Sequence, residues 1–246
     1  MYPSDLKIAE KNFSFSPVLF PAPQSSGHEI VAVTEFLDRD ILYSAYLQGI
    51  FPWYNQDQGE PVAWWSLDPR FVLFPEELHI PARLARFLRH TPYSYTIDKA
   101  FKQVIENCAK IKREGQNGSW IGSQMQEAYC DLHSIGVAHS IEAWKNNQLA
   151  GGFYGVQIGS VFFGESMFTL MPNSAKSAFV LFVQAFKECG GGLIDSQIYT
   201  DNIARFGGKN ISRTAFLHLE KQLLKRELIT PLQRHPTFNN QFDTLP

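Results

Sequence analysis

The sequence predicts an α+β fold, in which a small N-terminal domain precedes a larger domain with a mixed, mostly antiparallel sheet and flanking helices. Three strand-like segments separated by short turns occupy residues 139–168. Patterns typical of helices lie on both sides of them. An aromatic-rich stretch at 49–70, interrupted by Pro and Gly, cannot form a long regular element and divides the chain into two unequal parts.

Length and composition limit the class of protein. The chain has 246 residues, enough for one large and one small domain, and a formal net charge of −2, which disfavours non-specific nucleic-acid binding unless a local basic patch exists. Its three cysteines form no CxxC pair, and its seven histidines lack metal-ligand spacing. No stretch approaches the roughly 20 apolar residues of a membrane span. We therefore expect a cytoplasmic protein without disulfides or a metal ion.

The helices are predicted from apolar residues at helical spacing and from boundary residues. Asp38 is a suitable N-cap for the first helix, and Gly49 ends it. Asn173 or Ser174 caps the helix that follows the strands, and three glycines end that helix. The predicted helices span 38–48, 98–112, 123–134, 173–189 and 212–227.

The strands are predicted from apolar and β-branched runs bounded by turn residues, such as the two Asn of KNNQ. They span 139–144, 149–157, 161–168 and 193–198. A meander of three strands, then a helix, then a strand that can return beside the sheet is the core order of GNAT-like acyltransferases. We therefore predict a small N-terminal domain (1–67), a GNAT-like domain (68–230) and a loosely held C-terminal tail (231–246).

The strand LIDSQI carries two candidate catalytic residues. Because side chains alternate along a strand, Asp195 and Gln197 point to one face, about 6.5–7 Å apart, where both can reach one substrate group or a shared water. A carboxylate in a largely apolar strand requires a partner or a task. The alternative is a structural role, in which Asp195 caps a loop or pairs with Arg213.

Glu165, in VFFGESMF, is a further candidate. Alternation places Phe163, Glu165 and Met167 on one face, and Gly164 allows a ligand to approach the backbone closely. A buried Glu between Phe and Met suits a cationic amine. A structural ion pair with Lys176 explains the residue equally well.

A local basic patch is predicted in HIPARLARFLRH. Arg83, Arg86 and Arg89 recur at three-residue spacing, which on a helix aligns them along one face and suits phosphate binding. A solvated helix face is the alternative interpretation.

Four tryptophans lie in contexts flanked by Pro or Gly rather than in helical runs: Trp53, Trp64, Trp65 and Trp120. Loop tryptophans near a domain boundary either hold the domains together or stack on a nucleobase.

Eight short motifs, in order and spacing, resemble the bacterial leucyl/phenylalanyl-tRNA–protein transferase family. They are FPxP (20–23), AYxxGIFPWY (45–54), WWSxDPR (64–70), the WI of GSWI (120–121), AHSIExW (138–144), LAGGFYGV (149–156), FFGESMF (162–168) and LIDSQ (193–197). GIFPWY with WWSxDPR and GESMF is a highly specific combination. The resemblance extends from about residue 20 to residue 220.

The resemblance implies a monomeric enzyme that needs neither a metal nor an organic cofactor. Its donor would be Leu-tRNA or Phe-tRNA, with Met accepted less well, and its acceptor a protein with an N-terminal Arg or Lys, which then enters N-degron degradation. The tRNA ester supplies the driving force. An α-amine titrates near 7.7–8.0, so positioning should supply much of the rate.

The resemblance also implies roles for individual residues. Asp195 and Gln197 would relay the amine proton, and Glu165 would shape the charge of the site. Residues flanking the terminal adenosine would be Trp53 and Trp120. Residues lining the aminoacyl pocket would be Phe153, Met167, Phe179 and Phe182. Residues contacting the acceptor stem through phosphates would be Arg83, Arg86 and Arg89.

The sequence departs from the family at several positions. Pro81 and Ala82 stand at the start of the basic helix, where the family usually has Ser and Arg. Phe153 and Phe179 stand where Met or Leu is common, which predicts a narrower pocket for the donor side chain.

Competing functions are weaker. An acyl-CoA-dependent GNAT enzyme would open its central helix with a glycine-rich pyrophosphate loop, and TLMPNSAKS lacks those glycines. A non-catalytic tRNA- or protein-binding homologue is disfavoured because Asp195, Gln197 and Glu165 are retained. A peptidoglycan-building relative that uses aminoacyl-tRNA should lack GIFPWY.

Overall fold

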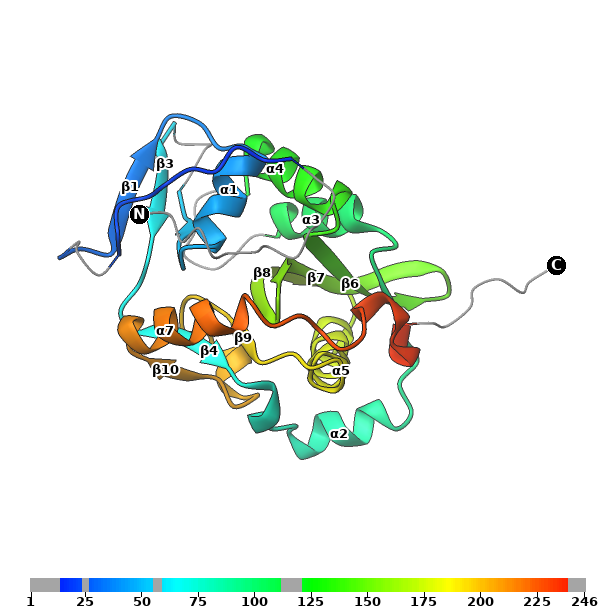
Figure 1. Cartoon of the computed structure of the whole chain (residues 1–246). Coiled ribbons are helices and arrows are strands. Elements are labelled where there is room, and N and C mark those ends of the chain that lie inside the picture. The colour runs from blue at the N-terminus through cyan, green and yellow to red at the C-terminus, as the bar shows by residue number, and fades with distance from the viewer. Residues whose placement is uncertain (1–13, 24–26, 55–58, 112–120, 239–246) are drawn as a thin grey trace.

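The chain folds around two sheets, a small N-terminal one and a large central one (Figure 1). The computed structural model describes residues 14–23, 27–54, 59–111 and 121–238. In the small sheet the strands are antiparallel in the order β1-β3-β2. The elements of this part are β1 (Ile30–Thr34), α1 (Arg39–Tyr46), β2 (Phe51–Pro52) and β3 (Val62–Trp65).

The large sheet has the strand order β10-β4-β9-β8-β7-β6-β5. Its neighbours are antiparallel except for β8 and β9, which are parallel. Its strands are β4 (Arg70–Leu73), β5 (Ser94–Ile97), β6 (Ala138–Lys145), β7 (Gln148–Ile158), β8 (Val161–Thr169), β9 (Leu193–Asp195) and β10 (Lys209–Ile211). The predicted α+β class, the three-strand meander and the returning parallel strand of a GNAT-like core are confirmed.

Helices cover both faces of the central sheet. In Figure 1, α1, α3 and α4 lie above the central strands, and α5 and α2 lie below them. The helices are α2 (Ala82–Leu88), α3 (Phe101–Lys110), α4 (Ser123–Ser134), α5 (Ser174–Glu188), α6 (Asp201–Ala204) and α7 (Arg213–Leu223). Short 3₁₀ turns are η2 (Pro75–Glu77), η3 (Leu232–Arg234) and η4 (Pro236–Phe238).

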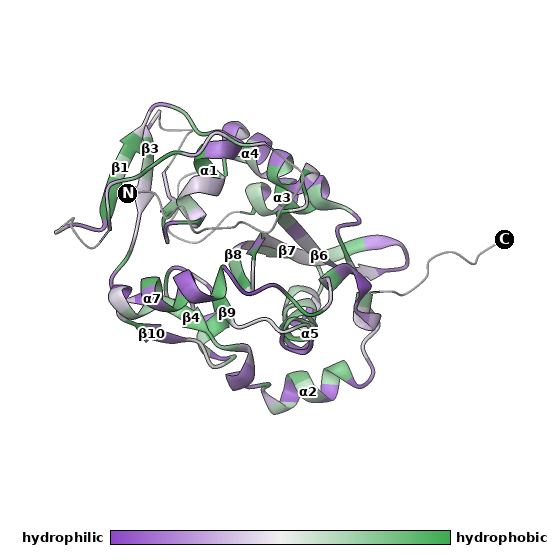
Figure 2. Cartoon of the chain, viewed as in Figure 1, coloured by the Kyte–Doolittle hydropathy of each residue, from purple (hydrophilic) through white to green (hydrophobic). Residues whose placement is uncertain are grey.

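The local signals explain why these elements begin and end where they do. The Asp38 carboxylate accepts the Ile41 N–H at 2.8 Å, so it is the predicted N-cap of α1. Asn146 and Asn147 both have positive φ, as the two-residue turn between β6 and β7 requires. Burial of apolar side chains from α5, the mostly green helix of Figure 2, fixes that helix against the sheet.

One sequence expectation is confirmed and one needs correction. As expected, the aromatic-rich stretch forms no long regular element; it contains the short strands β2 and β3, which pair with each other, and β3 also pairs with β1. The chain after residue 230 is not loosely held over 231–238, because Leu232 and Phe238 are buried in the core beside α5.

Candidate active site

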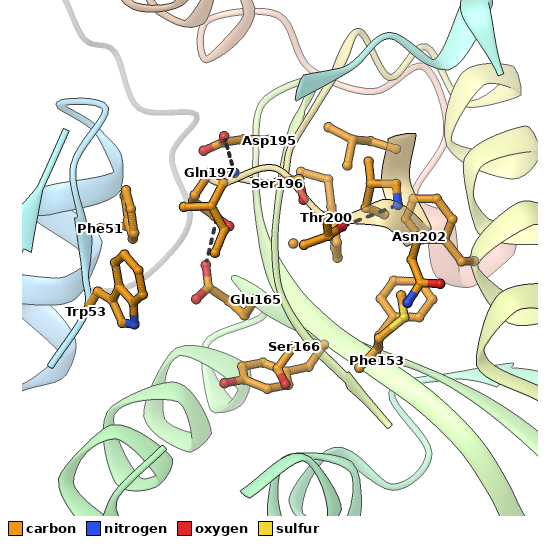
Figure 3. Close-up of a pocket in the computed structure, with 18 of the residues that line it drawn as sticks. Phe51, Trp53, Phe153, Glu165, Ser166, Asp195, Ser196, Gln197, Thr200 and Asn202 are labelled. Carbon is orange, nitrogen blue, oxygen red and sulfur yellow. Dashed lines mark hydrogen bonds between the residues drawn. The ribbon is translucent and has the colours of Figure 1, made fainter. Parts of the chain in front are cut away.

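A cavity of about 350 Å³ opens where β8 and β9 separate. The parallel pairing ends at Phe163 and Asp195. Beyond it, β8 contributes Glu165 to the cavity wall, and the segment after β9 contributes Gln197. In Figure 3, Phe51 and Trp53 lie at one end, Phe153 and Asn202 at the other, and Glu165 and Gln197 between them.

A β-bulge interrupts the regular pairing of β8 with β7 next to the cavity. Tyr154 pairs with Ser166 and Gly155 with Gly164, so Glu165 is the extra residue in β8. The expectation that Phe163, Glu165 and Met167 share one face is therefore wrong. Phe163 packs in the core on the α3 side, whereas Met167 packs on the α5 side. The bulge re-aims the Glu165 carboxylate toward the cavity.

Asp195 is held by a buried ion pair. The Arg70 guanidinium donates to its two oxygens at 2.8 and 2.7 Å, and neither side chain has any exposed surface. Arg70 itself lies between the rings of Phe51 and Phe216, 4.6 and 4.5 Å from their centroids. The partner of Asp195 is thus Arg70. Arg213, the alternative considered from sequence, donates instead to the carbonyls of His28 and Ser66.

A further buried carboxyl lies behind this pair. Glu220 of α7 is 2% exposed, and burial raises the pKa of Glu220 well above its ordinary value, although Arg70 pulls it down. A neutral Glu220 leaves the charge of Arg70 committed to Asp195.

The sequence predicted that strand β9 continues through Gln197, but in the structure it does not. β9 ends at Asp195, and Gln197 has φ 56°, in the left-handed region. Its backbone N–H donates to Asp195 Oδ1 at 3.0 Å, which fixes this turn. Its side-chain amide then donates to Glu165 Oε1 at 3.3 Å (Figure 3). The three candidate catalytic residues are therefore brought together by a turn rather than by strand alternation.

Glu165 receives two tyrosine hydroxyls from helices that lie on the same side of the sheet but are far apart in the sequence. Tyr46 of α1 donates at 2.6 Å and Tyr129 of α4 at 2.8 Å, and the two hydroxyl oxygens are 2.5 Å apart. Burial raises the pKa of Glu165 to about 7, and the tyrosine hydrogen bonds oppose that rise. The expected alternative, an ion pair with Lys176, is absent among the described residues.

The apolar end of the cavity is built by β7, β8 and α5. Phe153, Met167 and Phe179, which the resemblance assigns to the aminoacyl pocket, line this end. Phe182 does not: it lies one layer behind, with its ring 5.3 Å from that of Phe153. Ile203 and Asn202 of α6 complete this end.

The tryptophans divide into two groups. Trp53 lines the cavity and is 37% exposed, so one face remains available for stacking. Trp64 is fully buried, and Trp65 packs beside Trp53 with ring centroids 5.6 Å apart, so both hold the small sheet together. Trp120 lies outside the described residues.

The basic patch forms on α2, away from the cavity. Arg83, Arg86 and Arg89 are exposed, and within the described ranges none of them takes part in an ion pair. The patch is therefore free to meet an anion. α2 lies at the outer edge of the molecule, below α5 (Figure 1).

Sequence reasoning missed four residues that build the site: Tyr46, Tyr129, Arg70 and Glu220. Tyr46 and Arg70 lie inside the motifs AYxxGIFPWY and WWSxDPR, so their neighbourhood was a usable signal. Tyr129 and Glu220 carry no such signal, because each is one of several residues on the inner face of a helix.

The described residues contain no group of three or more His, Cys, Asp and Glu that could hold a metal ion. Among the described helices, none is both long and apolar enough to cross a membrane.

A cavity with a carboxylate and an amide at its centre, an apolar end and an exposed indole suits a group-transfer reaction. The sequence model of leucyl/phenylalanyl-tRNA protein transferase matches residues 72–221, and that of its N-terminal domain matches 37–68. The chain belongs to this family and is an aminoacyltransferase.

Relatives support the same assignment. The leucyl/phenylalanyl-tRNA–protein transferases of Yersinia pestis (strain Pestoides F) and Yersinia pseudotuberculosis (serotype O:1b) are each 46% identical over 208 residues, covering 83% of this chain and 86% of theirs. Among solved structures, L-PGS from Bacillus licheniformis aligns with a TM-score of 0.36 at 12% identity, over 71% of this chain and 57% of that one.

Proposed function

We propose that this enzyme transfers leucine or phenylalanine, and methionine less well, from aminoacyl-tRNA to the α-amine of proteins that begin with Arg or Lys. The observation that carries the proposal is the cavity itself. One wall is apolar and suits an unbranched aminoacyl side chain, and the centre presents Glu165 and Gln197 to an amine. The acceptor proteins would thereby be marked for N-degron degradation, in the cytoplasm and by a monomeric enzyme that uses no cofactor.

The donor would occupy the cavity along its length. The side chain of the amino acid enters the end formed by Phe153, Met167 and Phe179, where burial of apolar surface supplies affinity. The terminal adenosine stacks on Trp53 at the other end. Between them, the ester carbonyl comes to rest near Glu165 and Gln197.

The remaining assignments follow from chemistry. Gln197 orients the incoming amine, because an amide is a poor base. Asp195 serves best as the anchor of Gln197, since it is fully buried, paired with Arg70 and accepts the backbone N–H of Gln197. Arg83, Arg86 and Arg89 bind acceptor-stem phosphates, which gives affinity without sequence choice. The domain boundaries 1–67 and 68–230 are part of the same proposal, with residues 231–238 packed against the second domain.

The test is a transfer assay. Purified protein is incubated with tRNA charged with labelled Leu or Phe and with a peptide that begins with Arg. A peptide that differs only in beginning with Ala is the control. Label on the Arg peptide alone is the expected result. Binding of charged tRNA without transfer to any basic N-terminus would favour a non-catalytic homologue.

A further inference from the structure

We propose that Glu165 accepts the proton of the attacking amine and that Tyr46 and Tyr129 are positioning residues that hold its carboxylate ready for this task. The inference rests on the proposed aminoacyl transfer and assigns the proton within it. It differs from the relay through Asp195 and Gln197 that the sequence suggested.

Geometry separates the two carboxylates. Both oxygens of Asp195 are occupied by Arg70, the Gln197 N–H adds a third bond, and the side chain has no exposed surface. Glu165, by contrast, is partly exposed and lines the cavity. A base must reach the proton that it removes. Both carboxylates border the cavity, but Asp195 has no exposed surface and is paired with Arg70, so Glu165 is the one that a substrate amine can reach.

The surroundings of Glu165 suit proton exchange near neutral pH. Tyr46 comes from α1 and Tyr129 from α4, and both donate to the carboxylate, which favours its charged form. Burial and the negative charge of Asp195 favour the neutral form, whereas Arg70 favours the charged form. The opposing effects leave the pKa of Glu165 at about 7, close to that of an α-amine.

Gln197 links this base to the substrate. Its side-chain amide donates to Glu165 Oε1 at 3.3 Å, so an amine oriented by Gln197 would lie beside the carboxylate. The left-handed turn at Gln197, fixed by Asp195, gives the amide this direction.

The step balances without a co-reactant. The amine nitrogen bonds to the ester carbonyl carbon, and the amine proton moves to the Glu165 carboxylate. The bond between that carbon and the ribose oxygen then breaks, and the ribose oxygen takes the proton from the Glu165 carboxyl group. The products are an amide and a ribose hydroxyl, and Glu165 is again a carboxylate.

The experiment is the pH profile of kcat from pH 6 to 8.5 for wild type, Glu165→Gln, Tyr46→Phe and Tyr129→Phe, with an Arg-initiated peptide and charged tRNA. Glu165→Gln should lower kcat about a hundredfold or more while the KM for tRNA stays within a few fold. Each Tyr→Phe variant removes a donor to the charged carboxylate, so its midpoint should move to higher pH by about one unit.

Tyr43→Phe is the matched control. Tyr43 lies one turn before Tyr46 on the same helix, and its buried ring packs edge-on against Phe15, away from Glu165. The pH midpoint of the Tyr43→Phe variant should equal that of wild type. A general loss of packing in α1 would instead lower kcat in Tyr43→Phe and Tyr46→Phe without moving the midpoint of either.

Two results would overturn the inference: a Glu165→Gln enzyme within threefold of wild type, or Tyr46→Phe and Tyr129→Phe enzymes with the wild-type midpoint. The tyrosine variants decide the matter even if Glu165→Gln folds poorly. A wild-type enzyme that transfers no amino acid would instead contradict the proposed function.

Discussion

Desolvation raises the pKa values of two glutamates, Glu142 and Glu165, to about 7, and the surroundings of the two differ in one decisive respect. Glu142 lies on β6, where it is paired with Thr96 of β5 on one side and Gly152 of β7 on the other, and has no exposed surface. Glu165 lies on β8 at a bulge, where the strand leaves its parallel neighbour and a cavity opens. A similar shift of pKa thus marks a closed structural site in one region and an accessible site in the other.

The hydrogen-bond partners of the two carboxylates show the same contrast. Glu142 accepts bonds from the hydroxyls of Thr96 and Ser140 and from the Ala100 N–H, all of them local to the β5–β6 edge. Glu165 accepts bonds from Tyr46 and Tyr129, whose helices belong to separate parts of the chain. A perturbed pKa indicates function only where the group also faces a cavity.

The largest effect is expected on the stability of the protein, from breaking the Arg70–Asp195 ion pair beside the cavity. Asp195→Asn leaves the Arg70 charge buried without its partner, and should lower the free energy of unfolding by about 3–5 kcal/mol. Urea unfolding at pH 7 measures it. Replacing both residues, as Arg70→Met with Asp195→Leu, should recover most of the loss. A single variant as stable as wild type would show that the pair is not a structural anchor.

The next largest effect is the pH dependence of stability that Glu142 causes. Burial raises the pKa of Glu142 to about 7 in the folded state, so the folded protein binds this proton more tightly than the unfolded chain does. Its contribution to stability is therefore fully present below about pH 4.5 and is lost as pH rises through about 7.

Glu142→Gln removes this titration. Between pH 5.5 and 8.5 the free energy of unfolding of wild type should fall by on the order of 1–3 kcal/mol more than that of the variant. Urea titrations at the two pH values give the comparison. Equal pH dependence in both proteins would mean that Glu142 does not titrate in this range.

A smaller effect sharpens the account of the cavity. Phe153→Leu should widen its apolar end and raise the preference for Phe-tRNA over Leu-tRNA, as a ratio of kcat/KM, by about tenfold. Phe182→Leu is the matched control, because Phe182 lies behind the lining. Its ratio should stay at the wild-type value. The same ratio change in both variants would place Phe182 in the pocket after all.

The smallest effect is expected outside both regions, on α2. Changing Arg83, Arg86 and Arg89 to Gln should raise the KM for charged tRNA and reduce the slope of log KM against log salt by about one for each phosphate that is no longer bound. Steady-state kinetics at several salt concentrations measure the slope. An unchanged slope would show that the arginines form an ordinary solvated helix face.

Local features of the fold were predictable from the sequence, and distant contacts were not. The Asp38 cap and the Asn146–Asn147 turn depend on neighbouring residues, so composition and spacing revealed them. The Arg70–Asp195 pair joins residues 125 positions apart. The sequence indicated that Asp195 needs a partner or a task, but nothing local showed that Arg70 is that partner. The bulge at Glu165 was also hidden, since regular alternation predicted a different face.

Glu165, which borders the cavity, takes part in the reaction, whereas the enclosed Glu142 does not. This difference is tested most directly by single-turnover transfer from charged tRNA to an Arg-initiated peptide at pH 7.5, with Glu165→Gln and Glu142→Gln compared with wild type. The account predicts a rate at least a hundredfold below wild type for Glu165→Gln and a rate near wild type for Glu142→Gln. Equal rates for the two variants would contradict it.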